Sequence, residues 1–110
     1  MSGQDLMLEL QEQKDLLRVA LKESGKRGET HAQAEHDYRV ALGKQIAIER
    51  TKGTPVTIIS DVCRGDPVVA KLKFQRDVAE VVYKSAMEAI NVYKLNIKTL
   101  ENQIDREYRG

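Results

Sequence analysis

The fold is decided by residues 67–108, PVVAKLKFQRDVAEVVYKSAMEAINVYKLNIKTLENQIDREY. Two sets of apolar residues recur there at seven-residue intervals and interleave at steps of three and four, as in a coiled coil. A helix of about 42 residues cannot cover such a seam by itself, so the pattern predicts packing against a partner helix. The seam comprises Leu72, Ala79, Tyr83, Ala86, Ile90, Tyr93, Ile97, Leu100 and Ile104.

This helix has a well-marked start and end. Asp is a strong helix N-cap, and Pro is favoured at the first helical position, so Asp66 and Pro67 predict the start. Arg106 and Arg109 suit the carbonyl end of the helix dipole. We therefore expect a helix over residues 67–108.

A first long helix is predicted over residues 4–52, where leucines form a stripe in the first part. Gly53 and a following proline end it, because Gly suits a helix C-cap and the residue before Pro avoids the α region. Residues 24–28, SGKRG, contain two glycines, each costing about 1 kcal/mol relative to Ala inside a helix. A continuous helix, a bend, or a break with a new cap at Thr30 all stay open.

The connector spans residues 53–66. Its β-branched content suits a strand, but we favour a short helix over residues 58–63. Thr57 would be the N-cap of this helix and Gly65 its stop. The apolar side chains that would then cover the open end of the hairpin are Ile58, Ile59 and Val62.

Two long helices joined by a short connector are expected to fold back antiparallel. The second helix carries a further apolar group outside the seam, and an exposed apolar patch usually marks an interface. The sequence thus predicts an all-α fold, a single domain over residues 1–110. Its long antiparallel helical hairpin, with a short helical connector, should assemble into an oligomeric helix bundle, a homodimer or larger. The further apolar group comprises Phe74, Val78, Val81 and Val92.

Composition narrows the class of protein. The chain has 110 residues, a net charge of +1, 32% charged residues and 5% aromatic residues. This balance lacks the one-signed charge of a dedicated duplex-DNA binder. The single cysteine excludes an intrachain disulfide, and no apolar run approaches the roughly 18 residues of a membrane span. The N-terminus does not resemble a signal peptide, so we expect a cytoplasmic protein without a membrane partner.

Residues able to carry chemistry are sparse. His31 and His36 are five apart, about 140° around a helix, whereas paired zinc ligands on helices are commonly four apart. His31 and Glu35 have that spacing but supply only two ligands. Cys63 has no histidine nearby in sequence to act as a base, so buried packing is its favoured role. We expect no enzyme, no catalytic residue, no metal and no cofactor.

A basic cluster is the main candidate for binding a ligand or nucleic acid. Its cations and its aromatic ring could hold a nucleotide or a single strand by charge and stacking, although charged helix starts are commonly just solvated. Arg76 falls on the apolar seam, where it should pair with an acidic residue of another helix or mark a functional opening. The cluster comprises Arg64, Lys71, Lys73, Phe74 and Arg76.

Four stretches carry a resemblance: YRVAL at residues 38–42, PVTII at 55–59, VAKLKFQRDVAE at 69–80 and AINVYKL at 89–95. Together they resemble small uncharacterised all-helical proteins of phages and prophages of Gram-positive bacteria. The resemblance extends over most of the chain as a pattern and contains no catalytic motif. It implies a phage origin, the cytoplasm of a host bacterial cell and an accessory role, and it supplies no site residues.

Two functional hypotheses follow from these observations. The first is a phage-derived, non-enzymatic interaction module that oligomerises and inhibits or sequesters a host component, such as a protein of a host defence system. The alternative is an accessory protein that binds single-stranded nucleic acid or nucleotides. That protein would be a helper in recombination or replication, or a sponge that holds cyclic nucleotides between adjacent subunits.

Overall fold

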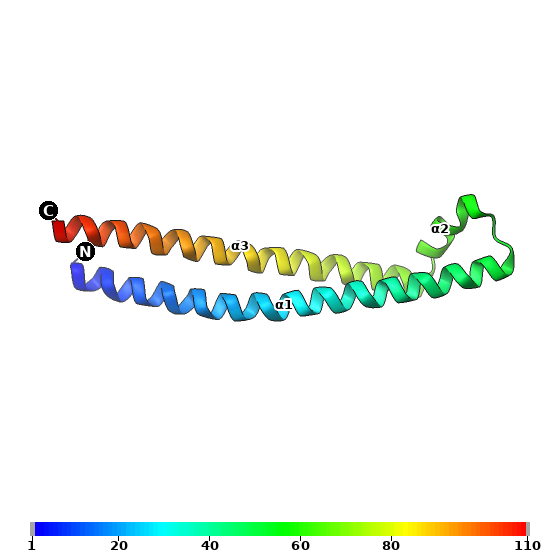
Figure 1. The fold of residues 1–110 in the computed structure, drawn as a ribbon, viewed down its shortest axis with the longest axis horizontal. Helices are drawn as coiled ribbons and strands as arrows, with labels where there is room; N and C mark the ends of the chain where they lie inside the picture. The colour runs from blue at the N-terminus through cyan, green and yellow to red at the C-terminus, as the bar shows by residue number, and fades with distance from the viewer. Residues whose placement is uncertain (1, 110) are drawn as a thin grey trace. The chain divides into compact units, whose positions relative to one another are not determined.

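The computed structural model describes residues 2–109, which form a long, a short and a second long helix (Figure 1). These are α1 (Gly3–Lys52), α2 (Val56–Arg64) and α3 (Pro67–Arg109). Residues 2–109 contain no strand, so the all-α prediction is confirmed; residues 1 and 110 of the predicted domain lie outside them. Oligomeric assembly stays a prediction. No helix in the described part of the chain is long and apolar enough to span a membrane.

The start of α3 is capped as the sequence predicts. Asp66 Oδ2 accepts hydrogen bonds from the backbone amides of Val68 and Val69 over 3.1 and 3.2 Å. These are two of the amides that lack a partner within the helix. Asp66 therefore fixes where α3 begins.

The end of α1 is a Schellman motif centred on Gly53, whose φ is +81°. The Gly53 amide donates to the carbonyl of Arg50 over 3.1 Å, and the Thr54 amide donates to the carbonyl of Glu49 over 3.0 Å. Only glycine adopts this left-handed conformation without steric cost. The predicted C-terminus at residue 52 is thereby confirmed.

The connector helix differs from the prediction in its start and in its covered face. α2 begins at Val56, directly after Pro55, and has no side-chain cap, so Thr57 is not the N-cap. Ile59 and Cys63, four residues apart, share one face of α2 and are buried. Ile58 and Val62 stay exposed, and of the three apolar side chains expected to cover this end only Ile59 is buried.

The helix α1 runs without interruption through residues 24–28. A Cβ atom at Gly25 would meet no heavy atom within 4 Å, whereas one at Gly28 would lie 3.2 Å from Cε1 of Tyr83. Gly28 therefore permits a close approach of the Tyr83 ring. A second cap at Thr30 does not form.

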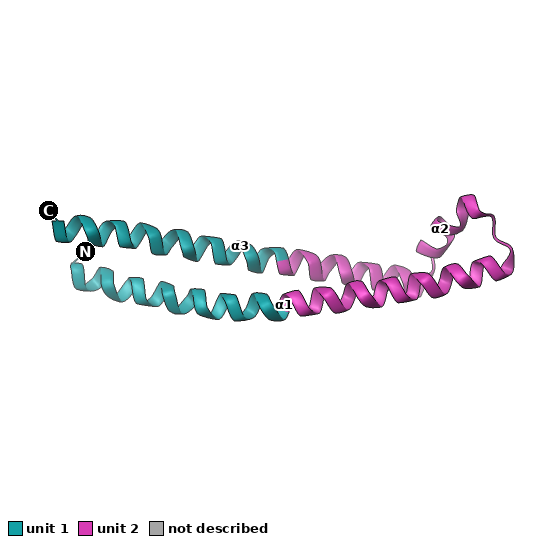
Figure 2. Ribbon diagram, in the orientation of Figure 1, with its two compact units in different colours: residues 1–26, 84–110 teal, residues 27–83 magenta. Residues whose placement is uncertain are grey.

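The chain forms two compact units, coloured separately in Figure 2. The first combines residues up to Lys26 with those from Lys84 onward, and in it the two helical segments run antiparallel. The Asn96 side-chain amide donates a hydrogen bond to Gln13 Oε1 over 3.1 Å. The core of this unit is formed by Leu6, Leu10 and Leu100, with Ile97 and Ile104 packed against them.

The second unit runs from Arg27 to Tyr83 and contains α2. Its long segments also run antiparallel, because Gly28 lies against Tyr83 and Glu35 pairs with Arg76. The buried apolar residues of this unit are Tyr38, Ile59, Cys63 and Val69. The predicted seam residues are buried or half-buried in both units, with Ile90 and Leu100 the most buried among them.

Candidate functional site

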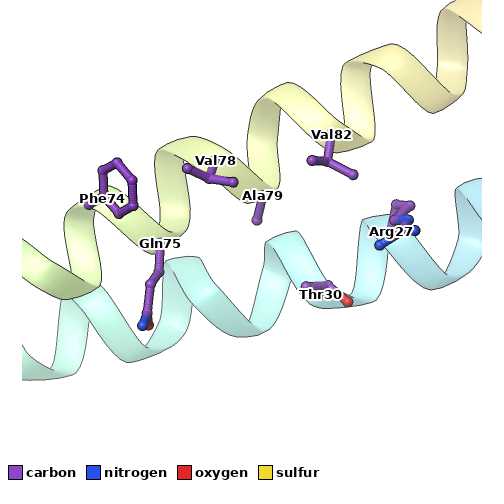
Figure 3. A pocket seen from close by; sticks show the side chains of 7 residues that line it. All are labelled: Arg27, Thr30, Phe74, Gln75, Val78, Ala79 and Val82. Carbon is purple, nitrogen blue, oxygen red and sulfur yellow. The ribbon is translucent and has the colours of Figure 1, made fainter.

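A groove with a volume of about 280 Å³ lies between α1 and α3 in the second unit (Figure 3). Figure 3 shows the ring of Phe74 near one end of the groove and Arg27 near the other. Most of the α3 side is aliphatic or aromatic carbon. The lining residues are Arg27 and Thr30 from α1, and Phe74, Gln75, Val78, Ala79 and Val82 from α3.

The groove exists because α3 is apolar on two sides. Phe74 follows the seam residue Leu72 by two positions, which is about 200° around a helix. The side of α3 that carries Phe74, Val78 and Val81 therefore turns away from the seam. These three side chains are 68%, 46% and 64% exposed. The partner segment of α1 thus leaves part of the apolar surface of α3 in water.

Beside the groove, α1 contributes a polar strip. Glu29, Gln33 and Asp37 line a neighbouring hollow that shares Thr30, Gln75 and Ala79 with the groove. Asp37 is held in place, because Oδ1 lies 3.2 Å from His36 Nδ1 and accepts a hydrogen bond from Gln33 Nε2 over 2.8 Å. Both contacts lower the pKa of Asp37, and the contact with His36 contributes most. An anionic carboxylate is therefore fixed at one end of the strip.

Arg76 lies on the seam and pairs with an acidic residue of the other helix, one of the two outcomes that the sequence predicts. Its Nε lies 3.4 Å from Glu35 Oε2, and its guanidinium also bonds to Asp77 Oδ1. The guanidinium carbon lies 4.5 Å from the ring centroid of Tyr38. The pKa of Arg76 is raised, and the hydrogen bond to Asp77 is the largest cause. These contacts hold the side chain between the two helices.

The other members of the predicted basic cluster do not form one patch of free charge. Lys73 Nζ lies 3.0 Å from Asp77 Oδ2, and this bond is the main reason that the pKa of Asp77 is lowered. Arg64, Lys71 and Phe74 are exposed. Of the predicted binding residues, the structure places Phe74 in the groove and Arg76 in the contact between helices.

The two histidines have different surroundings. The ring of His31 stacks on that of Tyr83 with centroids 6.0 Å apart, whereas His36 lies against Asp37. Within residues 2–109, no three His, Cys, Asp or Glu side chains gather in a way that could hold a metal ion.

Cys63 is buried, as predicted. Burial is the main cause that raises the pKa of its thiol, and the carboxylates of Glu49 and Asp66 add to this effect. The neutral thiol is therefore favoured over the nucleophilic thiolate.

Glu49 is a buried carboxylate that the sequence analysis did not single out. Its Oε2 accepts a hydrogen bond from the Thr54 hydroxyl over 2.6 Å, and its Oε1 accepts one from Gln45 Nε2 over 3.2 Å. The bond from Thr54 is the main cause that lowers the pKa of Glu49. The hydrogen bond between Glu49 and Thr54 ties the end of α1 to the connector.

Arg27, Thr30 and Asp37 were also missed as site residues. Their side of α1 carries no apolar periodicity that would mark it. A signal was available nonetheless, because fixing Glu35 opposite Arg76 would have placed this segment of α1 level with residues 74–84 of α3.

Comparison with protein-family models, curated proteins and solved structures finds no match to this chain.

Proposed function

We propose that this protein is a self-associating helical interaction module that acts by binding and not by catalysis. The observation that carries the proposal is the apolar side of α3 in the second unit, where Phe74, Val78 and Val81 are exposed within two helical turns. A contiguous exposed apolar surface on a helix is characteristic of an interaction site. A partner helix laid along it would remove these side chains from water.

The surroundings of this surface support binding. Burial of apolar surface contributes about 25 cal/mol per Å², and the large aromatic ring of Phe74 is the type of residue that anchors interfaces. The nearby ionisable groups Glu35, Arg76 and Asp77 are engaged with one another. The Glu35–Arg76 pair links α1 to α3 and supports their register, so the apolar surface is presented on a fixed scaffold.

The partners that we propose are further copies of this chain and, through the oligomer, a host macromolecule. The resemblance to phage and prophage proteins makes a component of a host defence system the class to test first. A stoichiometric inhibitor needs a complementary surface rather than an active site, and the groove with its exposed ring offers such a surface.

Light scattering over a wide range of protein concentration tests the proposal. We expect wild type to self-associate and Phe74→Ser to associate at least tenfold more weakly, since a hot-spot aromatic contributes about 2 kcal/mol or more. Leu8→Ser is the matched control, because Leu8 is about as exposed, at 65% against 68%, but lies in the first unit. A monomeric wild type, or equal association of Phe74→Ser and wild type, would count against the proposal.

The second candidate is binding of single-stranded nucleic acid or of nucleotides. The observation in its favour is that Phe74 and Lys71, one helical turn apart, are both exposed, so a base could stack while its phosphate meets the cation. Fluorescence anisotropy with a single-stranded oligonucleotide at two salt concentrations tests this candidate. Binding that weakens with salt and is lost in Lys71→Glu would support it. A thermal-shift assay with cyclic nucleotides tests whether the protein is a sponge for them, because a bound nucleotide would raise the melting temperature.

A further inference from the structure

We infer that the groove of the second unit is covered by a second copy of this chain, packed antiparallel about a two-fold axis that crosses the groove near Val78. The inference rests on the proposed function, self-association through the apolar side of α3, and adds the face, the orientation and the register. In this arrangement the part of α1 that belongs to the second unit packs on the same part of α1 in the second copy, and the part of α3 beside the groove packs on its equivalent. Each residue pair then occurs twice, as in any isologous interface.

Charge complementarity along α1 gives the first measure of the register. Arg27 lines the groove, and Asp37 lines the hollow next to it. They carry opposite charges and lie ten residues apart on one helix. In an antiparallel two-fold pair centred midway between them, at the level of Ala32, each Arg27 faces Asp37 of the other copy. The two charge pairs would fix orientation and register.

Shape complementarity along α3 gives a second and independent measure. Phe74 is a large exposed ring at one end of the groove, and Val82 lines the other end beside the small Ala79. An antiparallel pair centred midway, at Val78, places each Phe74 ring against Val82 of the other copy. The end of the groove that carries the large Phe74 ring thus packs against the end of the other copy's groove that carries the smaller side chains of Val82 and Ala79.

The two centres coincide in space. Gly28 lies against Tyr83, and Glu35 pairs with Arg76, so one residue further along α1 corresponds to one residue back along α3. Ala32 is therefore level with Ala79, which is next to Val78. The centre required by the charges on α1 and the centre required by the apolar residues on α3 agree within one residue, or about 1.5 Å along a helix.

A parallel arrangement is less favourable for the same residues. A two-fold axis along the helices would lay α1 of one copy on α3 of the other at the same level. The pairing of Glu35 with Arg76 puts Asp37 level with Phe74, so the Asp37 carboxylate would lie against the apolar ring. Covering a charge with an apolar ring carries a desolvation cost, and the ring would supply no charge to offset it, whereas Arg27 of the second copy does so in the antiparallel arrangement.

A charge exchange tests the register, with association constants measured by sedimentation equilibrium. Arg27→Glu alone and Asp37→Arg alone should each weaken association by about tenfold or more, because each places like charges opposite one another. The double variant should regain most of the loss, since the pair is restored with its signs reversed. Circular dichroism of each variant checks that the helices are retained.

Disulfide trapping supplies a readout that does not depend on those charges. Val78→Cys lies at the proposed axis and should form a disulfide between two copies under mild oxidation, because the two equivalent positions approach closely. Val40→Cys is the matched control, being a valine of similar exposure, 43% against 46%, on α1. Wild type, whose Cys63 is buried, should not cross-link under these conditions.

The outcomes separate this inference from the proposed function. Association that depends on Phe74 but is not rescued in the double charge variant overturns the antiparallel register alone, as does equal cross-linking of Val78→Cys and Val40→Cys. A wild type that stays monomeric at all concentrations overturns both. Rescue together with selective cross-linking of Val78→Cys establishes the arrangement.

Discussion

At the scale of single residues, Gly25 and Gly28 lie in the same stretch of α1 but have different surroundings. Gly25 faces open space, so its only effect is the conformational freedom that it gives the unfolded chain. Gly28 faces the ring of Tyr83, which itself stacks on His31. Sequence alone shows two equivalent helix-weakening residues, and the contact of Gly28 with a neighbouring helix distinguishes them.

We predict that Gly25→Ala raises the free energy of unfolding by about 1 kcal/mol and that Gly28→Ala raises it by clearly less. The added methyl group at residue 28 would lie 3.2 Å from the Tyr83 ring, so the ring must shift. Urea denaturation followed by circular dichroism measures both. Gly43→Ala is the control, because residue 43 also faces open space. An equal gain for Gly28→Ala would contradict the close packing described.

At the scale of secondary-structure elements, the joint between α1 and α2 depends on a carboxylate. The hydrogen bond from Thr54 stabilises the ionised form of Glu49 in the folded protein and lowers its pKa. A carboxylate with a lowered pKa contributes stability above its unfolded-state pKa, about 4.3 for Glu. That contribution is lost as pH falls through the lower pKa of the folded state.

Thr54→Val should therefore destabilise the protein at neutral pH and lose this effect in acid. We expect the urea midpoints of wild type and Thr54→Val to differ at pH 7 and to converge as pH falls below about 4. Thr51→Val is the control, since Thr51 donates to the carbonyl of Ala47 and not to a carboxylate. A difference that is constant from pH 7 to pH 3 would show that the ionisation of Glu49 is not responsible.

The seam of α3 gives a sharper prediction at the same scale. Ile90 is 4% exposed, whereas Val92, two residues along the helix, is 49% exposed. Ile90→Asp should lower the free energy of unfolding by about 3 kcal/mol or more, because it buries an unpaired charge. Val92→Asp should cost much less. Thermal denaturation of both variants in the same buffer compares them, and similar melting temperatures would mean that the seam is assigned wrongly.

At the scale of the whole molecule, stability and assembly are linked. If folded chains bind one another and unfolded chains do not, mass action raises the apparent stability as protein concentration increases. The groove and the side of α3 next to it span only about two helical turns, which suits a weak interface rather than a large obligate one. We therefore expect the apparent stability to rise gradually with protein concentration.

We predict that the Tm of wild type rises with protein concentration and that the Tm of Phe74→Ser does so less. The variant removes the ring of Phe74, a residue that is 68% exposed, so its effect on the stability of the folded monomer should be small. Differential scanning calorimetry over a wide concentration range measures the slopes. Identical slopes for the two proteins would place the association surface elsewhere on the molecule.

The sequence by itself determined that two long helical segments are present, where α3 begins and where α1 ends, but not where α2 begins. Asp66 and Pro67 start α3, Gly53 ends α1, and the seven-residue spacing gives the buried side of α3, because capping and periodicity act over a few residues of one chain segment. The partner of Arg76, the role of Gly28 and the groove of Arg27 and Phe74 were decided only by the tertiary structure. They depend on which residues of α1 lie level with which residues of α3. That register is set by contacts between residues far apart in sequence, which no local pattern contains.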